Sequence, residues 1–292
     1  MKLRWEARGH HFYDRSTGIH VLLDEIPVEE NSRDAGPELL SIALLNACDL
    51  DCRFCYAPKA PYRLEPDFVL DICRQFAALG TLEVAFGGGE PTLYPGLGDL
   101  CRRIWSETDL GISITTHGHH LSDRLIEELA GHISVIRVSI DAPEPLYSEI
   151  RGRPLSALQQ RLSAISGRIP LGVNTVIDRT TLSRLDDLAP VVRKLGAIDW
   201  LLLPETSGGS FQLTATEWET LDRWIAKHWE EMPLLVAEEA VPHLNCPIAF
   251  SCENGGYAHI RADGALCRSS YTGAGLPLTG QPIIEVLARL AQ

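Results

Sequence analysis

The stretch "LLSIALLNACDLDCRFCYAP", residues 39–58, joins a continuous apolar run to a loop that carries three cysteines within eight residues. An apolar run of this length is typical of a parallel strand that is buried on both faces. Cys48, Cys52 and Cys55 follow it with the spacing C-x3-C-x2-C. Since an odd number of thiols in one short loop does not suit a disulfide, the loop predicts a metal or redox site.

Similar apolar runs recur along the chain, and a helical pattern separates each run from the next. We expect strands at residues 39–46, 81–86, 111–116, 133–140, 169–177 and 197–204. We expect helices at residues 65–80, 94–109, 121–131, 144–166 and 181–196. This alternation predicts an α/β fold with a parallel sheet, and six units are too few to close an eightfold barrel. A partial (β/α)6 TIM-like barrel follows, with its chemistry on the loops after the strands.

Two smaller segments flank the predicted barrel, which we assign to residues 39–210. Residues 1–38 predict a short β-hairpin followed by a polar linker. Residues 211–292 predict a small α+β extension that begins with an amphipathic helix at 214–232. An Asp263-Gly264 turn in this extension predicts a second hairpin.

Composition and charge argue against several classes of protein. The 292 residues include 26 Lys plus Arg against 39 Asp plus Glu, which gives a net charge of −13. This acidic balance makes nucleic acid an unlikely partner, because binding the phosphate backbone needs clustered cations. We see no signal peptide and no apolar run long enough to span a membrane. Eight cysteines without a secretory signal indicate a reducing compartment, so we expect a cytoplasmic protein.

The cysteine loop suits an iron–sulfur cluster better than zinc. Three thiolates can hold a [4Fe–4S] cluster and leave one iron for another ligand. A structural zinc site needs four ligands, commonly as two C-x2-C pairs. Zinc would therefore require Cys246, Cys252 or a histidine as the fourth ligand.

The motif "CDLDCRFC", with Phe54 at its aromatic position, resembles the signature of the radical SAM superfamily. "EVAFGGGEPTL", residues 83–93, is similar to the GGEP motif of that family. The resemblance implies a [4Fe–4S] cluster on Cys48, Cys52 and Cys55 that binds S-adenosylmethionine through its open iron. It implies reductive cleavage of that cofactor to a 5′-deoxyadenosyl radical, which abstracts a hydrogen atom from the substrate. A flavodoxin- or ferredoxin-type electron donor is the expected partner.

The resemblance also implies a set of cofactor-binding residues after successive strands. Gly88, Gly89 and Glu90 would hold the methionyl amino group, Ser139 and Asp141 would contact the ribose, and Arg151 would meet the carboxylate. The full set is Phe54, Gly88, Gly89, Glu90, Thr116, Ser139, Asp141, Arg151 and Asn174.

Other readings remain for some of these positions. A glycine turn before a helix would also explain residues 87–91, and an ordinary helix-end cation would explain Arg151. His117, His119 and His120 are better read as loop or substrate-facing residues than as metal ligands. Cys73 and Cys101 share helix faces with apolar residues and are expected in the core.

Three further cysteines, Cys246, Cys252 and Cys267, lie around the predicted C-terminal hairpin. This region resembles the twitch and SPASM extensions of radical SAM enzymes, in which cysteines bind an auxiliary [4Fe–4S] cluster. A full SPASM region has seven cysteines, so two auxiliary clusters are excluded by count. A second cluster on these three, a hydrogen-atom-donating cysteine and plain structural thiols all remain open.

The resemblance implies a radical SAM enzyme, and a peptide or protein side chain is the leading substrate class. The runner-up is a small molecule such as a sugar or aminocyclitol, changed by epimerisation or dehydrogenation. A third reading, from a different class, is a non-catalytic metal-binding scaffold. Glu90 with its glycines speaks against that scaffold, because a scaffold has no need of a ligand cradle.

Overall fold

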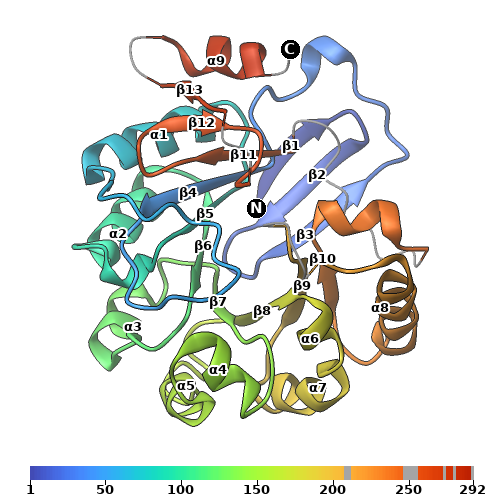
Figure 1. Ribbon diagram of the computed structural model, residues 1–292. Coiled ribbons are helices and arrows are strands. Elements are labelled where there is room, and N and C mark those ends of the chain that lie inside the picture. The colour runs from blue at the N-terminus through green and yellow to red at the C-terminus, as the bar shows by residue number, and fades with distance from the viewer. Residues whose placement is uncertain (207–211, 246–255, 272–273, 279–280, 291–292) are drawn as a thin grey trace.

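A computed structural model describes the chain except for residues 207–211, 246–255, 272–273, 279–280 and 291–292. Its main feature is a curved sheet of ten strands in the order β10-β9-β8-β7-β6-β5-β4-β11-β12-β13. Figure 1 shows the helices around the outside of this curve, with the two ends of the sheet apart. Strands β4 to β9 pair in parallel and in chain order, which confirms the predicted partial barrel.

The elements of the barrel agree with the expected βα alternation. The strands are β4 (Leu39–Leu45), β5 (Glu83–Gly88), β6 (Gly111–Thr116), β7 (Val135–Ser139), β8 (Leu171–Ile177), β9 (Asp199–Pro204) and β10 (Leu234–Val236). The helices are α1 (Pro66–Ala78), α2 (Leu97–Glu107), α3 (Asp123–Leu129), α4 (Leu146–Arg151), α5 (Leu155–Leu162), α6 (Arg179–Leu182), α7 (Leu185–Lys194) and α8 (Ala215–His228). Short 3₁₀ turns occur at Glu30–Ser32, Pro91–Leu93 and Glu238–His243.

The structure differs from the expected barrel elements in several places, and the helix expected at 181–196 is the two helices α6 and α7. The helical region at 144–166 is two helices, because Gly152 ends α4 in a left-handed conformation and Pro154 precedes α5. A seventh parallel strand, β10, follows α8 and pairs with β9. The sequence did not indicate β10, since three apolar residues are too few to show a strand pattern.

The two faces of the barrel sheet differ in polarity. One row across the strands, Ile42–Phe86–Ile114–Ile136–Leu171, belongs to the core that packs under the helices. The neighbouring row on the inner face carries small or polar residues, Ser41–Ala85–Ser113. The strands therefore bury apolar side chains outward and leave a polar interior. Cys73 and Cys101 are fully buried in the helix layer, as expected.

The first 38 residues form a three-stranded antiparallel sheet rather than a hairpin alone. Strands β2 (Gly9–Asp14) and β3 (Ile19–Leu23) make the predicted hairpin, and β1 (Lys2–Glu6) adds a third strand to β2. The side chain of Lys2 donates to the carbonyls of Ala77, in the last turn of α1, and of Thr81, just after it. Arg15 donates to the carbonyls of Trp105 and Thr108 at the end of α2. This sheet therefore closes the end of the barrel where the strands begin.

The C-terminal segment extends the barrel sheet. Strand β11 (Tyr257–Ile260) pairs in parallel with β4, and β12 (Ala265–Cys267) and β13 (Leu276–Pro277) follow in antiparallel order. Gly264 has φ +84° in the turn between β11 and β12, which confirms the predicted hairpin. Helix α9 (Ile283–Leu290) lies beyond β13 (Figure 1). The division into domains at residues 38 and 210 stays a prediction.

We predict that Arg4→Met weakens the attachment of the N-terminal sheet. Arg4 is buried and donates to the carbonyls of Gly80 and Gly36, so its loss leaves two buried acceptors unsatisfied. The expected cost is about 1–3 kcal/mol per group, measured as a lower midpoint of urea unfolding. Arg124→Met is the matched control, because Arg124 is an exposed partner of Glu128. An equal effect of both substitutions would contradict this role.

Candidate cofactor site at the strand ends

The three cysteines of the motif lie on the loop that follows β4, at the end of the barrel opposite the N-terminal sheet. Cys48 and Cys52 are half-buried, Cys55 is exposed, and all three are free thiols. Three thiols are one ligand short of the four that a structural zinc site needs, and they suit a [4Fe–4S] cluster that keeps one iron open.

The glycines of the GGEP-like motif hold the cysteine loop by its backbone. The Gly89 amide donates to the Leu45 carbonyl at 2.7 Å, and the Glu90 amide donates to the Ala47 carbonyl at 2.8 Å. A Cβ on Gly88 would lie 2.3 Å from the Leu45 oxygen, and one on Gly89 would lie 2.2 Å from the Ala47 oxygen. Side chains at these positions would push the loop away. A Cβ on Gly87, by contrast, would meet nothing within 4 Å.

Glu90 is the centre of a buried hydrogen-bond network. Its side chain is 1% exposed, and its carboxylate accepts from the backbone and hydroxyl of Thr92, from the Thr116 hydroxyl and from the His117 amide. The structure thus gives both Glu90 and Thr116 a role in positioning the loops. Direct contact of either residue with a cofactor stays a prediction.

Asp49, inside the cysteine motif, binds the loops after β6 and α4. Its carboxylate lies 3.0 Å from Nε2 of His117 and 3.0 Å from Nε2 of His120, and it also pairs with Arg153. Burial acts to raise the pKa of Asp49, but the hydrogen bonds of the two histidines outweigh it and lower the pKa to about 2. The cysteine motif did not indicate this role, because Asp49 lies between Cys48 and Cys52 at a position that the motif leaves unspecified.

Hydrogen bonds at both ring nitrogens fix the orientation of His117. The His119 amide donates to Nδ1 of His117, so Nε2 carries the proton and donates towards Asp49 and Glu90. Burial lowers the pKa of His117. A neutral, hydrogen-bonded ring agrees with the expectation of a loop histidine, although it lies within 4.8 Å of Cys48 and Asp49.

Arg151 brings a positive charge to the cysteine loop. Its Nε donates to Asp141 at 2.6 Å, and its Nη1 lies 3.5 Å from Sγ of Cys52. The ring of Phe54 lies 5.3 Å from the guanidinium and packs against Ala142 and Leu146. Asp141 also accepts from the Val176 amide, so both of its oxygens are engaged. Asp141 therefore anchors Arg151, and its contact with a ribose stays a prediction.

Burial and nearby charges change the pKa values of the Cys48 and Cys52 thiols. Burial raises the pKa of both, while Arg151 acts in the opposite direction on Cys52. A cation this close to the sulfur would stabilise the thiolate form that an iron cluster requires. The donor set and the charge thus fit a cluster.

Ser139 and Asn174 are neighbours across β7 and β8, near the strand ends. Asn174 is buried, and its amide oxygen lies 3.4 Å from Nη1 of Arg137. Arg137 itself forms a bidentate pair with Asp199. The two predicted residues are thus brought together on the inner face, while their contact with the adenosyl group stays a prediction.

The C-terminal cysteines are described only in part. Cys246 and Cys252 lie outside the described residues, and Cys267 is fully buried on β12. The auxiliary cluster therefore stays a prediction.

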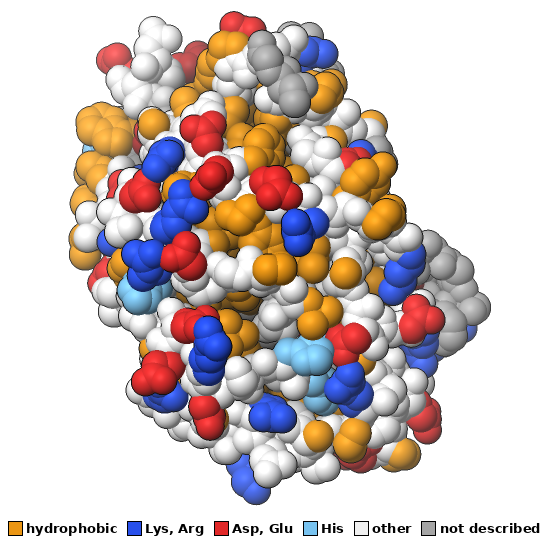
Figure 2. Space-filling model, turned by 90° about the vertical axis from the view of Figure 1, so that its left-hand side faces the viewer, with side chains coloured by type: hydrophobic (Ala, Val, Ile, Leu, Met, Phe, Trp, Pro, Cys, Tyr) orange, Lys and Arg blue, Asp and Glu red, His pale blue; other side chains and the backbone are white. Residues whose placement is uncertain are grey.

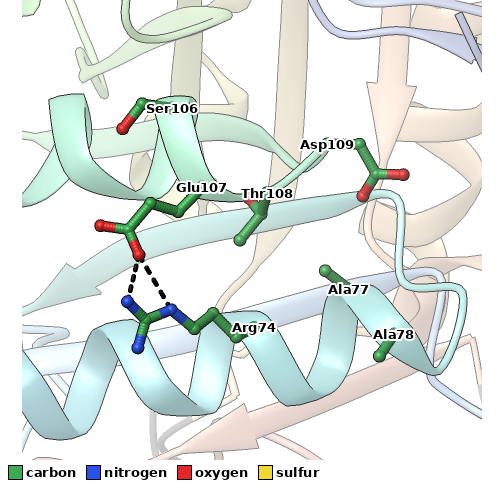
Figure 3. A pocket seen from close by; sticks show the side chains of 7 residues that line it. All are labelled: Arg74, Ala77, Ala78, Ser106, Glu107, Thr108 and Asp109. Carbon is green, nitrogen blue, oxygen red and sulfur yellow. Dashed lines mark hydrogen bonds and ion pairs between the residues drawn. The ribbon is translucent and has the colours of Figure 1, made fainter.

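Two cavities help to locate the site. A cavity of about 300 Å³ lies between the cysteine loop and the β11–β12 hairpin, lined by Asn46, Tyr56, Tyr62, His259 and Tyr271 among others. A shallow depression of about 450 Å³ lies between the ends of α1 and α2, where Arg74 pairs with Glu107 (Figure 3). Since those helix ends precede the first residues of β5 and β6, the depression is at the end opposite the cysteines. It is therefore no part of the cofactor site.

We predict that Gly88→Ala disturbs the cysteine loop and Gly87→Ala does not. Gly88 has φ +113°, and its new Cβ would clash with the Leu45 carbonyl. Strain of about 1–3 kcal/mol should lower the thermal midpoint and reduce iron uptake on reconstitution several-fold. Gly87→Ala should retain the iron content of the wild-type protein. Normal iron content and stability in Gly88→Ala would refute the backbone role.

The chain is similar to known proteins over more than half of its length. The family model "Radical SAM superfamily" matches residues 42–189, half of the chain. The sporulation killing factor maturation protein SkfB of Bacillus subtilis (strain 168) is 26% identical over 206 residues, which cover 67% of this chain and 49% of that protein. GTP 3′,8-cyclase of Synechococcus elongatus is 28% identical over 210 residues, which cover 65% of this chain and 63% of that protein. The matched parts thus cover about half to less than two thirds of these relatives.

Solved structures show the same fold. Streptococcus suis SuiB bound to its precursor peptide SuiA superposes with a TM-score of 0.77 at 15% identity, covering 98% of this chain and 86% of that one. None of the helices in the described residues is long and apolar enough to cross a bilayer. Because the family model covers half of the chain, including the barrel and its cysteine loop, the chain belongs to the radical SAM superfamily, whose members use a [4Fe–4S] cluster and S-adenosylmethionine.

Proposed function

We propose that this radical SAM enzyme modifies a side chain of a peptide substrate. Cys48, Cys52 and Cys55 would hold the cluster, and the remaining iron would take S-adenosylmethionine. When bound, these groups supply one-electron cleavage of the sulfonium and hydrogen abstraction from an unactivated carbon. A flavodoxin- or ferredoxin-type protein is the proposed electron donor.

The chain's own residues position this chemistry. Arg151, held by Asp141, lies beside Cys52 and would balance the negative charge of the cluster. The open side of Gly87 leaves space at the mouth of the barrel, where a cofactor would meet the backbone. Ser139 and Asn174 offer polar groups on the same inner face of the sheet, on β7 and β8.

The residues that line the 300 Å³ cavity are the main support for a peptide as the substrate. Tyr56 and Tyr271 meet edge to face with ring centroids 4.8 Å apart, and Asn46 and His259 add polar groups. Burial lowers the pKa of His259 to about 4, so this ring is neutral at neutral pH. Among the described residues that line the cavity, Arg261 is the one Lys or Arg, and it pairs with Asp263. Aromatic and neutral polar groups suit a peptide, whereas a triphosphate needs several cations.

One face of the molecule agrees with this choice. Figure 2 shows a face on which Lys and Arg are interspersed with Asp and Glu, with hydrophobic side chains between them. A mixed surface of this kind offers no concentrated positive charge for a polyanion. The names of SkfB, a maturation protein, and of the SuiB–SuiA complex add support for a peptide substrate.

A small-molecule substrate is the second candidate, because the cyclase relative, at 28% identity, is named for GTP. The two candidates differ in what should stimulate turnover, so a direct comparison can separate them.

We predict that Cys48→Ala/Cys52→Ala/Cys55→Ala removes about four irons per chain after anaerobic reconstitution, because these thiols would hold one [4Fe–4S] cluster. A fall from about four to nearly none would mean one cluster, and a fall from about eight to about four would reveal a second. Iron and acid-labile sulfide are measured together. Cys73→Ala, in the buried helix layer, is the control and should keep the wild-type iron content. Zinc in place of iron would overturn the proposed site.

We predict that peptides stimulate 5′-deoxyadenosine formation by the reduced enzyme and that nucleotides do not. The probes are short peptides encoded next to this gene, GTP and a nucleotide sugar, each with S-adenosylmethionine and dithionite. Mass spectrometry follows the nucleoside and any mass change in the peptide. Tyr271→Leu should weaken the stimulation by removing one aromatic wall of the cavity. Stimulation by GTP or the sugar alone would favour the second candidate.

A further inference from the structure

A second cluster of metal-ligating side chains lies at the closed end of the barrel. His11 on β2, His20 on β3 and Glu38 directly before β4 have ligand atoms that all lie within 4.8 Å of one another. His11 is 1% exposed and Glu38 is 8% exposed. Strand β4, with seven residues, separates this cluster from the cysteine loop by about 23 Å at roughly 3.3 Å per residue. The cluster is thus distinct from the cofactor site.

The two imidazoles are arranged as metal ligands commonly are. Nδ1 of His11 lies 2.6 Å from the Glu6 carboxylate, and Nε2 of His11 lies 2.9 Å from Nδ1 of His20. The carboxylate holds the proton on Nδ1 and leaves the lone pair of Nε2 directed at His20. With metal–nitrogen distances of about 2.05 Å, a 2.9 Å separation corresponds to an angle of about 90°, as between adjacent octahedral positions. A tetrahedral site would need a separation of about 3.3 Å, a movement of a few tenths of an ångström.

The carboxylate of Glu38 is the third group of the cluster. Among the described residues its carboxylate accepts no hydrogen bond, and its nearest cationic groups are Arg8 at 3.8 Å and His11 at 3.9 Å. Burial raises the pKa of Glu38. Its carboxylate oxygens have lone pairs available beside the two histidines, and a cation bound between these groups would pair with them.

The charges around the cluster balance before an ion is added. Arg8 lies 3.3 Å from the Glu6 carboxylate, and Nε of Arg4 lies at the same distance from it. Two carboxylates therefore face two arginines, and the histidines add no charge when neutral.

We infer that His11, His20 and Glu38 form a binding site for a divalent transition-metal ion such as Zn²⁺, with Glu6 orienting His11. Two imidazoles and a carboxylate are ligands that Zn²⁺ and Fe²⁺ accept. The ion would join both strands of the N-terminal hairpin to the residue that starts the first barrel strand. A hydrogen-bonded chain from Glu6 through His11 to His20 is the competing account, and it leaves Glu38 without a donor.

Zinc retention by the full chain tests the inference. Enzyme with its reconstituted cluster is given ZnCl₂, desalted and analysed for zinc per chain and for thermal midpoint. Wild type should retain about one Zn²⁺ and unfold at a higher temperature, because the ion binds the folded state. His20→Gln and Glu38→Gln should lose both the zinc and the shift while keeping the iron content. His132→Gln, at a histidine after α3 that is not part of the cluster, should behave as wild type.

X-ray absorption at the zinc edge of the wild-type enzyme tests the ligands without a substitution. Nitrogen and oxygen neighbours at about 2.0–2.1 Å would support the site. Sulfur neighbours at about 2.3 Å would mean that cysteines hold the zinc, and would overturn the inference. Equal zinc retention in both variants and the wild type, or none in the wild type, would overturn it as well.

Discussion

The close approach of two backbones at the end of β5 is the constraint on which the cofactor site depends. Gly88 and Gly89 allow β5 to meet the start of the cysteine loop within hydrogen-bond distance, at the carbonyls of Leu45 and Ala47. The same approach places Glu90 where Thr116 and the His117 amide can donate to it. Glycine is required because any Cβ would overlap a carbonyl oxygen, so the motif serves the placement of the loop.

A second layer of polar contacts fixes the loop from the other side. Asp49 binds His117, His120 and Arg153, and Arg53 pairs with Asp178 at the start of α6. Loops after β4, β6, β7 and β8 thus converge on one short segment. In a parallel sheet all these loops lie at the same edge, which is why residues more than 100 positions apart in the chain can act together.

The two ends of the barrel have different roles. At the strand ends the loops leave a cavity and an open glycine surface, where the chemistry would take place. At the strand starts the N-terminal sheet covers the interior, and Tyr13 reaches Glu83 from it at 3.4 Å. The His11–His20–Glu38 cluster lies at this closed end, so a metal there would stabilise the closure and leave the chemistry at the other end unaffected.

The sequence by itself determined the alternation of strands and helices, the partial barrel and the three-cysteine loop, because periodicity and motif spacing are local properties of the chain. It also placed Gly88, Gly89, Glu90 and Arg151 near the site. It did not reveal that Glu90 is buried among hydrogen-bond donors, that Asp141 anchors Arg151, or that Asp49 joins three loops. Those contacts, and the pairing of β11 with β4 that builds the cavity, join segments far apart in sequence. Only the tertiary structure decided them, since the direction of a side chain across a sheet edge depends on which strands become neighbours.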